Sequence, residues 1–448
     1  MNIVNISKSD YSVGNLVGGE WVKGSGDGFE IISPYSGNSC GKVTFSTKDD
    51  VNSAVKYAAE AQKDWGNTPM KARAQILFKF REILLRDEQK ISQIISLENG
   101  KTLGESRAGL MKGVEVLEYA LSLQNADVGG KMEVSRGVFC EYRREALGVV
   151  ASITPFNFPA MVPMWTIPIA IALGNAYVWK PSEKTPLTSL YIANAFKEAG
   201  LPAGILTVIQ GSKDAVEAII DNKAVKAVGF VGSTKVAKLV YKRSTQNGKR
   251  ALCLGGAKNH IILLPDADIE VTGVGISDSF TGCAGQRCMA ASVLLAVGDV
   301  ENHINKIKQR AESQTLGNSM GAIITKEQVE FLNKAIDQAV KDGATLLLDG
   351  RNCDAPAEYQ NGFWLGPTIL DNVAAGTESA TLELFGPIIS IIRCKNVSEA
   401  IEIQNSCEYG NAASVFTSSG PMAEFVAKNT KCGMFGICLL YTSPSPRD

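Results

Sequence analysis

Five short apolar runs lie between residues 148 and 256, roughly 20 to 30 residues apart, with helical patterns between them: GVVASIT, AYVWK, ILTVIQ, AVGFVG and ALCLGG. This spacing is the length of a βαβ unit, so the runs predict parallel strands with helices on both faces of a sheet. A second series follows between residues 260 and 437: HIILL, ASVLLAV, ATLLLDG, IISIIR, AASVFTS and CGMFGI. The pattern therefore predicts an α/β fold with two doubly wound sheets.

The size and charge of the chain narrow the classes of protein to which it can belong. Its 448 residues exceed the length that one hydrophobic core usually serves, which favours at least two domains. A net charge of -1 provides no basic surface for nucleic acid or anionic lipid. The sequence has neither a signal-peptide pattern nor an apolar run near the roughly 18 residues of a membrane span. We therefore expect a cytoplasmic protein with a small-molecule ligand and no nucleic-acid or membrane partner.

The ten cysteines are scattered singly, with no CxxC pair and no Cys/His cluster at zinc spacing. This arrangement favours reduced thiols over a disulfide framework and predicts no metal site.

Two cysteines stand five residues apart in the stretch DSFTGCAGQRCMAAS, at Cys283 and Cys288. Arg287 directly precedes Cys288, and a nearby cation favours a thiolate. A catalytic histidine would have to be His260, which opens an apolar strand, or His303, in a charged helix that we predict to face solvent. Neither suits a catalytic base, which disfavours a cysteine hydrolase. The residues alone leave open which cysteine reacts.

Three further segments have readable local patterns. Residues 129–146 alternate around a Gly-containing turn, which predicts an exposed hairpin that needs partner strands. Residues 47–63 open with a capping-box pattern, Thr47 and Asp50, and continue as an amphipathic helix after a short N-terminal strand region. Residues 438–448, CLLYTSPSPRD, break a strand pattern with two Ser-Pro steps. We interpret this string as a non-native tail, because it reads in frame as a translated sequencing adaptor; a disordered native tail is the alternative.

A phosphate-binding turn is indicated at Gly232 and Ser233. The chain has no GxGxxG after a strand, but AVGFVGSTKVAKLVY (227–241) runs from a strand through these two residues into a helix. Such a turn directs backbone N–H groups and a helix dipole at an anion. An ordinary helix capped by Ser233 is the alternative.

Six motifs occur in the order found in the aldehyde dehydrogenase superfamily: ITPFNFP, WKPSE, FVGST, GAKNH, GQRCMA and ELFGP. The chain resembles that superfamily over residues 14–437, and GAKNH with RCMA resembles its CoA-acylating methylmalonate-semialdehyde dehydrogenase branch. The resemblance implies two Rossmann-like domains and a small β-hairpin. We assign an NAD-binding domain to residues 1–128 and 147–258, an oligomerisation hairpin to 129–146, whose C-terminal partner strand we expect to be missing, and a catalytic domain to 259–437.

The resemblance also implies roles for individual residues. Cys288 matches the nucleophile and Asn157 the side-chain donor of the oxyanion hole, whereas Cys283 matches no catalytic position. Arg287 matches an arginine that pairs with the substrate carboxylate, and Lys112 stands where some acylating relatives have a second such arginine. The residues implied to bind NAD are Thr154, Phe156, Lys180, Ser182, Glu183, Gly232, Ser233, Glu383 and Phe385.

The implied reaction is NAD-dependent oxidation of malonate or methylmalonate semialdehyde through a Cys288 thioester. Loss of CO2 and transfer to CoA then give acetyl-CoA or propionyl-CoA. Hydrolytic members carry a glutamate two residues before the Gly-Gly pair of an ELGG motif, where this chain has Cys253 in CLGG. A thiol ionises more readily than water, so CoA can attack without a general base there.

Two alternatives to this reading stay open. One is a hydrolytic NAD-dependent aldehyde dehydrogenase acting on another aldehyde, and the other is a non-catalytic protein on the same fold. The resemblance also implies a homodimer or homotetramer for the full-length protein.

Overall fold

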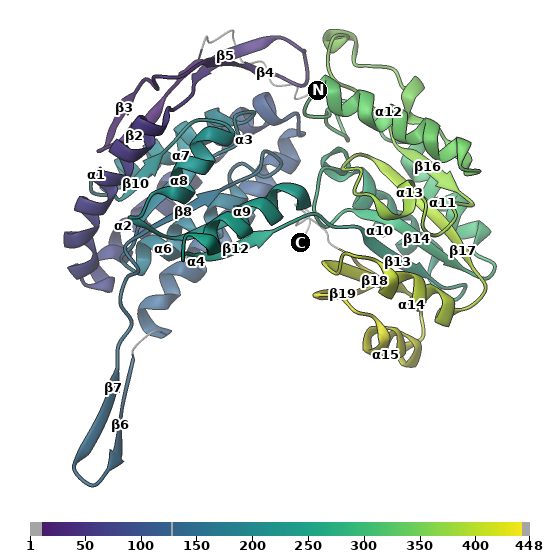
Figure 1. Ribbon diagram of the computed structural model, residues 1–448. Coiled ribbons are helices and arrows are strands. Elements are labelled where there is room, and N and C mark those ends of the chain that lie inside the picture. Colours follow the sequence, from purple (N-terminus) through teal and green to yellow (C-terminus); the bar gives the residue numbers. More distant parts are fainter. Residues whose placement is uncertain (1–10, 127–128, 441–448) are drawn as a thin grey trace.

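The computed structural model describes residues 11–126 and 129–440. The chain forms two lobes, which residues 255–258 join, and a hairpin that projects from the first lobe (Figure 1). Each lobe is built around a seven-stranded sheet. Within the described residues, no helix is both long enough and apolar enough to cross a lipid bilayer.

The first sheet contains all five strands that the first series of apolar runs predicts. These five strands are parallel, and two N-terminal strands extend the sheet in antiparallel pairing. In spatial order the strands are β12 (Arg250–Leu254), β11 (Val225–Val231), β8 (Val149–Ile153), β9 (Ala176–Lys180), β10 (Leu206–Val208), β2 (Asn15–Val17) and β3 (Glu20–Val22).

Helices cover both faces of this sheet. They are α1 (Lys48–Asn67), α2 (Met70–Arg86), α3 (Glu88–Asn99), α4 (Leu103–Ala126), α5 (Met161–Met164), α6 (Ile167–Ala172), α7 (Pro186–Glu198), α8 (Lys213–Asp221) and α9 (Thr234–Gln246). The predicted capping box at the start of α1 is confirmed, because Thr47 and Asp50 bond reciprocally to each other's backbone N–H groups.

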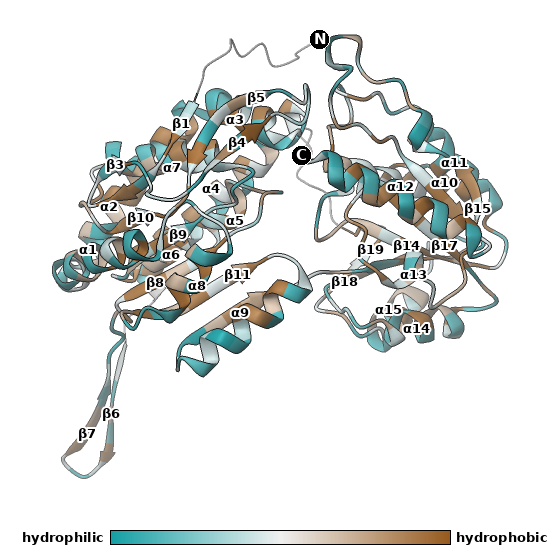
Figure 2. Cartoon of the chain, turned by 45° about the horizontal axis from the view of Figure 1, so that its top comes forward, coloured by the Kyte–Doolittle hydropathy of each residue, from teal (hydrophilic) through white to brown (hydrophobic). Residues whose placement is uncertain are grey.

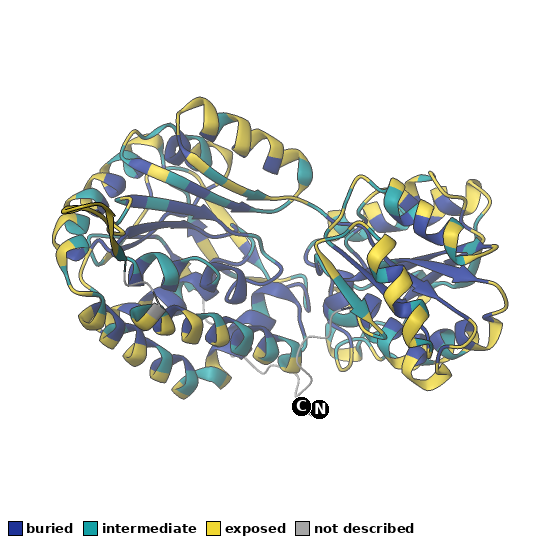
Figure 3. Ribbon diagram, turned by 90° about the horizontal axis from the view of Figure 1, so that it is seen from below, coloured by how far each residue is buried: buried dark blue, intermediate teal, exposed yellow. Residues whose placement is uncertain are grey.

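Strand β9 shows why the strands read as continuous apolar runs. Successive side chains of a strand point to opposite faces of the sheet. Tyr177 and Trp179 join a core with α2, α4 and α7, whereas Val178 joins a second core with α1 and α8. The centre of the sheet is therefore buried on both faces, as is typical of parallel sheets. Figures 2 and 3 show the same arrangement in both lobes, with apolar, buried strands and polar, exposed outer helix faces.

The second sheet contains all six strands of the second series and one strand that the pattern missed. Its spatial order is β15 (Thr345–Leu348), β16 (Thr368–Asp371), β17 (Ile388–Cys394), β14 (Ala291–Val297), β13 (Asn259–Leu263), β18 (Ala412–Phe416) and β19 (Met434–Ile437). The missed strand is the four-residue β16, which is too short to stand out as a run. Strand β15 pairs antiparallel with β16, whereas the other neighbours are parallel.

The helices of the second lobe connect these strands along the chain. They are α10 (Ile269–Thr281), α11 (Glu301–Glu312), α12 (Lys326–Lys341), α13 (Glu378–Thr381), α14 (Val397–Ser406) and α15 (Gly420–Asn429), with short 3₁₀ turns η1 (Gly282–Gly285), η2 (Gly350–Asn352) and η3 (Ala357–Tyr359).

Two smaller β elements complete the fold. A three-stranded sheet of β1 (Tyr11–Val13), β5 (Ser39–Thr44) and β4 (Gly28–Ile32) lies in the first lobe. The predicted exposed hairpin is confirmed: β6 (Gly130–Ser135) and β7 (Val138–Tyr142) pair only with each other, and every residue of β7 is exposed.

Of the predicted tail, residues 438–448, the structure describes residues 438–440. The described residues of this segment contact the second sheet, where Leu440 is buried and the Leu439 carbonyl accepts a hydrogen bond from Ser414. Residues 441–448 lie outside the described residues.

The short link between the lobes determines which edges of the two sheets face each other. Strand β12 ends at Leu254 and β13 begins at Asn259, so the chain leaves the carboxyl edge of the first sheet and enters the amino edge of the second. These two edges frame the site.

Candidate active site

A cavity of about 720 Å³ opens at the carboxyl edge of the first sheet. It lies where the chain order reverses: β8 and β11 are neighbours, while the chain between them has passed through β9 and β10 on the far side of β8. Such a switch point is where open α/β sheets bind ligands. The cavity brings together seven of the nine residues implied for NAD: Thr154, Phe156, Lys180, Ser182, Glu183, Gly232 and Ser233.

The polar part of the cavity is built around Lys180 and Glu183. The Lys180 ammonium lies 3.0 Å from a Glu183 carboxylate oxygen, and the lysine is almost completely buried. Burial alone would raise the pKa of Glu183, but the charge and hydrogen bond of Lys180 outweigh it and lower the pKa below its ordinary value. Glu183 is therefore an anionic acceptor suited to ribose hydroxyls.

The turn at Gly232 and Ser233 leads directly into α9. Ser233 occupies the N-cap position with extended backbone, but its side chain makes no capping hydrogen bond. The alternative of an ordinary Ser-capped helix is therefore wrong, and the first N–H groups of α9 are not occupied by that hydroxyl. Side-chain space at Gly232 is also restricted, because a methyl group there would lie 2.7 Å from the Phe230 ring.

The apolar wall of this cavity was missed by the sequence analysis. It consists of side chains from α8 and α9: Val216, Ile220, Val236, Leu239 and Val240. The available signal was the outward-facing apolar pair on α9, since Val236 and Leu239 are 40% and 59% exposed. An apolar wall beside buried polar groups is typical of a slot for a flat aromatic base.

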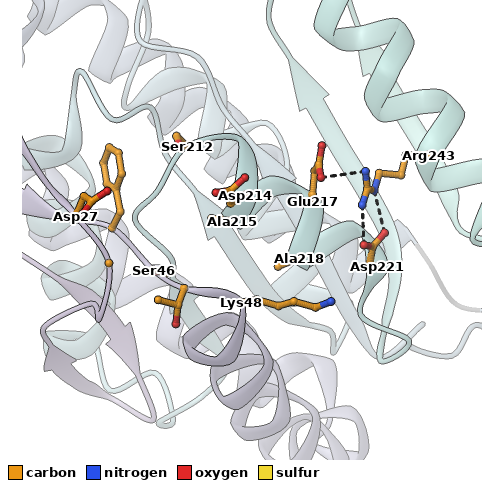
Figure 4. A pocket seen from close by; sticks show the side chains of 13 residues that line it. Asp27, Ser46, Lys48, Ser212, Asp214, Ala215, Glu217, Ala218, Asp221 and Arg243 are labelled. Carbon is orange, nitrogen blue, oxygen red and sulfur yellow. Dashed lines mark hydrogen bonds and ion pairs between the residues drawn. The ribbon is translucent and has the colours of Figure 1, made fainter.

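A second cavity of about 490 Å³ lies next to the first and shares Ser212, Glu217 and Arg243 with it (Figure 4). The Arg243 guanidinium lies 3.1 Å from Glu217 and 2.8 Å from Asp221. Because Glu217 and Asp221 belong to α8 and Arg243 to α9, these ion pairs connect the two helices that form the apolar wall.

The two cysteines of the GQRC stretch occupy different environments. Cys283 lies in η1, is buried, and packs against Phe158, Met161 and Val162. Cys288 is partly exposed. Burial raises the pKa of the Cys288 thiol, and the Glu383 carboxylate raises it further. The charge of Arg287 acts in the opposite direction, as expected from the sequence, but does not reverse the shift.

Asn157 reaches the cysteine loop from the first lobe. Its Nδ2 donates a 3.0 Å hydrogen bond to the carbonyl of Gln286, two residues before Cys288, and the side chain is buried. An amide nitrogen carries two N–H groups, so one remains for another acceptor.

The two candidate carboxylate-binding cations are placed differently. Arg287 is buried, and its Nε and Nη2 donate to the carbonyls of Gly282 and Asp278 at the end of α10, at 2.9 and 2.8 Å. Lys112 lies on α4 and pairs with Glu115 at 2.8 Å. Within the described residues, no hydrogen bond or ion pair joins Lys112 to the cysteine loop.

Glu383 and Phe385 connect the link between the lobes to the cofactor cavity. A Glu383 carboxylate oxygen accepts a 3.0 Å hydrogen bond from the backbone N–H of Ala257, and burial raises the pKa of this carboxyl. Phe385 has a φ of 58° and meets the Phe156 ring edge-on at 6.0 Å. Phe156 lines the cavity, so its contact with Phe385 places that residue of the second lobe beside the cavity.

Three residues outside this set bear on the mechanism. Cys253 is partly exposed on β12, and burial raises the pKa of its thiol. His260 is buried, shares a 2.9 Å hydrogen bond with the Lys258 carbonyl, and has a pKa lowered to about 4 by burial, which is typical of a structural histidine. The prediction for His303 is wrong: it is buried and bonds to the Ala267 carbonyl at 2.8 Å, because its helix turns this face inward.

The aldehyde dehydrogenase family model matches residues 21–443 of this chain. Malonate-semialdehyde dehydrogenase 2 of Geobacillus thermodenitrificans (strain NG80-2) is 38% identical over 439 residues, covering 96% of this chain and 90% of the relative. The enzyme of the same name from Bacillus mycoides (strain KBAB4) is 39% identical over 446 residues, covering 98% and 92%.

Two solved structures are similar over most of their length. A Sinorhizobium meliloti 1021 protein named for methylmalonate-semialdehyde dehydrogenase activity, complexed with NAD, matches with a TM-score of 0.94 at 36% identity, covering 97% of this chain and 90% of that one. Methylmalonate-semialdehyde dehydrogenase from Oceanimonas doudoroffii matches with a TM-score of 0.94 at 36% identity, covering 96% and 89%. With its motifs, its two sheets and its cysteine loop, this chain belongs to the aldehyde dehydrogenase family.

Proposed function

We propose that this chain is an NAD-dependent, CoA-acylating dehydrogenase of malonate or methylmalonate semialdehyde. The observation that carries the proposal is the hydrogen bond by which Asn157, the residue after the cavity-lining Phe156, holds the Gln286 carbonyl two residues before Cys288. The relatives and solved structures named for these two semialdehydes support the substrate class.

The cavity fits NAD on three counts. It offers an anionic acceptor at Glu183, a helix N-terminus at Ser233 whose N–H groups can meet phosphates, and the apolar wall of α8 and α9. We propose that Glu383, which the backbone N–H of Ala257 holds, binds the nicotinamide ribose. When bound, NAD supplies the acceptor for the hydride that the substrate loses.

We propose that the Cys288 thiolate adds to the aldehyde carbon. The second N–H of Asn157 and the backbone N–H of Cys288 then stabilise the tetrahedral oxyanion, a contribution typically worth about 10² to 10³ in rate for each donor. Oxidation leaves a thioester on Cys288. The bond to the substrate carboxylate then breaks to release CO2, and the α-carbon takes a proton from solvent. Attack of the CoA thiol on the thioester transfers the acyl group and releases Cys288 as a free thiol.

Cys253 favours CoA over water as the acyl acceptor. The thiol at this position has a pKa raised by burial, so it is neutral near pH 7 and cannot take a proton from water. CoA needs less help, because a free thiol has a pKa of about 8.5. A hydrolytic dehydrogenase needs a carboxylate at this position, and this chain has none there because residue 253 is a cysteine.

We propose that Arg287 binds the substrate carboxylate beside Cys288. The guanidinium is buried, and a charge-assisted pair in such a place is strong. Its donations to the carbonyls of Gly282 and Asp278 hold it in position and also give it a role in shaping the loop. Lys112 is a weaker candidate, because it already pairs with Glu115.

We also propose that residues 1–128 and 147–258 form the NAD-binding domain and 259–437 the catalytic domain. The hairpin is proposed to join subunits of a homo-oligomer, since it exposes Met132 and Phe139 by 67% and 59%. A cytoplasmic location stays a prediction from the sequence.

The test is NADH formation from malonate semialdehyde with and without CoA. Sustained turnover that requires CoA supports the proposal. Equal steady rates without CoA would replace it by the hydrolytic alternative, and no NADH under either condition from folded protein would favour a non-catalytic role.

A further inference from the structure

Two asparagine side chains converge on the backbone carbonyl of Cys288. Nδ2 of Asn259 donates to this oxygen at 2.8 Å, and Nδ2 of Asn411 donates to it at 3.0 Å. Asn259 is the first residue of β13, and Asn411 immediately precedes β18, the neighbouring strand. The carbonyl is therefore anchored to two adjacent strands at the amino edge of the second sheet.

Chemistry determines the orientation of the Asn259 amide. Its Nδ2 also donates to the Ala290 carbonyl at 2.8 Å, so both contacts of this atom are carbonyl acceptors. A flipped amide would place Oδ1 against two oxygens. Within residues 11–126 and 129–440, the Oδ1 of Asn259 is buried without a hydrogen-bond partner. Leaving a buried acceptor without a partner costs free energy of folding. The amide orientation that leaves Oδ1 unpaired is the one that lets Nδ2 donate to both carbonyls.

The loop has little regular structure of its own to hold it. Cys288 lies between η1 and β14, and the preceding residues Cys283, Ala284 and Gly285 all have positive φ angles. Cys288 belongs to no strand or helix, so no ladder of backbone hydrogen bonds positions its peptide.

We propose that Asn259 and Asn411 are positioning residues that hold the Cys288 peptide in the orientation required for reaction. By fixing the carbonyl, they fix the backbone that carries the Cys288 side chain, in the same loop that Asn157 holds through the Gln286 carbonyl. A misplacement of about 1 Å can cost roughly 10²-fold in rate. This inference rests on the proposed function, because it takes Cys288 as the nucleophile.

The test compares three variants with the wild-type chain. Asn411→Ala removes one donor, and Asn411→Asp replaces it, at nearly constant shape, by an oxygen that repels the carbonyl. Asn405→Ala is the matched control. Nδ2 of Asn405 also donates to a backbone carbonyl, at 2.8 Å, but that carbonyl belongs to Asn429 and not to the cysteine loop. For each variant we would measure the melting temperature, the first-turnover rate of NADH formation and the KM for NAD. Alkylation of Cys288 by iodoacetamide would be followed as well, with peptide mass spectrometry to locate the modified residue.

We expect first-turnover rates lowered by about 3- to 10-fold in Asn411→Ala and by about 10- to 100-fold in Asn411→Asp. The KM for NAD should stay unchanged, and Asn405→Ala should retain the wild-type rate. Wild-type first-turnover rates in both Asn411 variants would overturn the inference. So would a loss confined to melting temperature, or a rise in KM as large as the loss of rate. If alkylation of Cys288 leaves wild-type NADH formation intact, the proposed function itself fails, whatever the Asn411 variants show.

Discussion

The two sheets are built alike but contribute to the site through opposite edges. The first sheet offers its carboxyl edge, where the turns after β8 and β11 line the cofactor cavity. The second offers its amino edge, where the loop before β14 carries Cys288. The difference follows from the link, because β12 passes into β13 through only residues 255–258. A doubly wound sheet therefore does not dictate which edge acts; the connection to its neighbour does.

If the amino edge of the second sheet supplies the nucleophile, changes there should stop chemistry and leave cofactor binding intact. Cys288→Ala should reduce NADH formation by about 10³-fold or more, because it removes the sulfur that we propose forms the thioester. Cys283→Ala should retain most activity, since Cys283 is packed against Phe158 and Met161. Steady-state kinetics with NAD-binding titrations checks both, and equal losses in the two folded variants would refute the assignment.

Variants of Asn157 test whether the first lobe also contributes to the chemical step. Asn157→Ala removes an oxyanion donor, so kcat should fall by about 10² to 10³ while the KM for NAD changes little. Asn157→Asp serves as a second variant, because it keeps the shape but removes the donor. A kcat within about twofold of wild type in both variants would restrict the role of Asn157 to holding the Gln286 carbonyl.

Gly232 offers the reverse experiment at the cofactor edge. A methyl group at Gly232 would lie 2.7 Å from the Phe230 ring, so Gly232→Ala should displace the turn that meets the phosphates. We expect a rise in the KM for NAD of about 10-fold, from an overpacking cost of about 1 to 3 kcal/mol. Alkylation of Cys288 should proceed at the wild-type rate. A change in that rate would mean that the two edges are not independent.

Glu383 lies between the edges and should couple them electrostatically. Its carboxylate is one cause of the raised pKa of Cys288. Glu383→Gln removes that negative charge, so the pKa of Cys288 should fall and the thiolate should form at lower pH. The pH midpoint of Cys288 alkylation, measured without NAD, should therefore move downward. A midpoint that stays in place or rises would show that burial alone raises the pKa.

The sequence predicted the sheets better than it predicted contacts within the site. All eleven apolar runs became strands. The central strands, such as β9 and β13, are buried on both faces, and such strands need a continuous apolar run. Strand β16 was not predicted because it has only four residues. Strand β15 lies at the edge of the sheet, where a strand can pair in either direction, and it pairs antiparallel.

The local details could not be predicted for physical reasons. His303 is buried because tertiary packing, not the composition of its helix, decides which face turns inward. The contacts of Arg287 with α10, and of Asn411 with Cys288, join residues whose distance in space no spacing along the chain reveals. The polar residues of the cofactor cavity were predicted from motifs at the carboxyl ends of β8, β9 and β11, whereas its apolar wall on α8 and α9 was not predicted.

The most direct test of the account is the state of Cys288 after one turnover without CoA. Folded protein is mixed with NAD and malonate semialdehyde, NADH is followed by stopped flow, and the protein is analysed by mass spectrometry before and after addition of CoA. The account predicts a burst of about one NADH per site, one acyl group on the Cys288 peptide, and its release when CoA is added. Continued NADH formation without CoA, or an unmodified Cys288 after the burst, would contradict it.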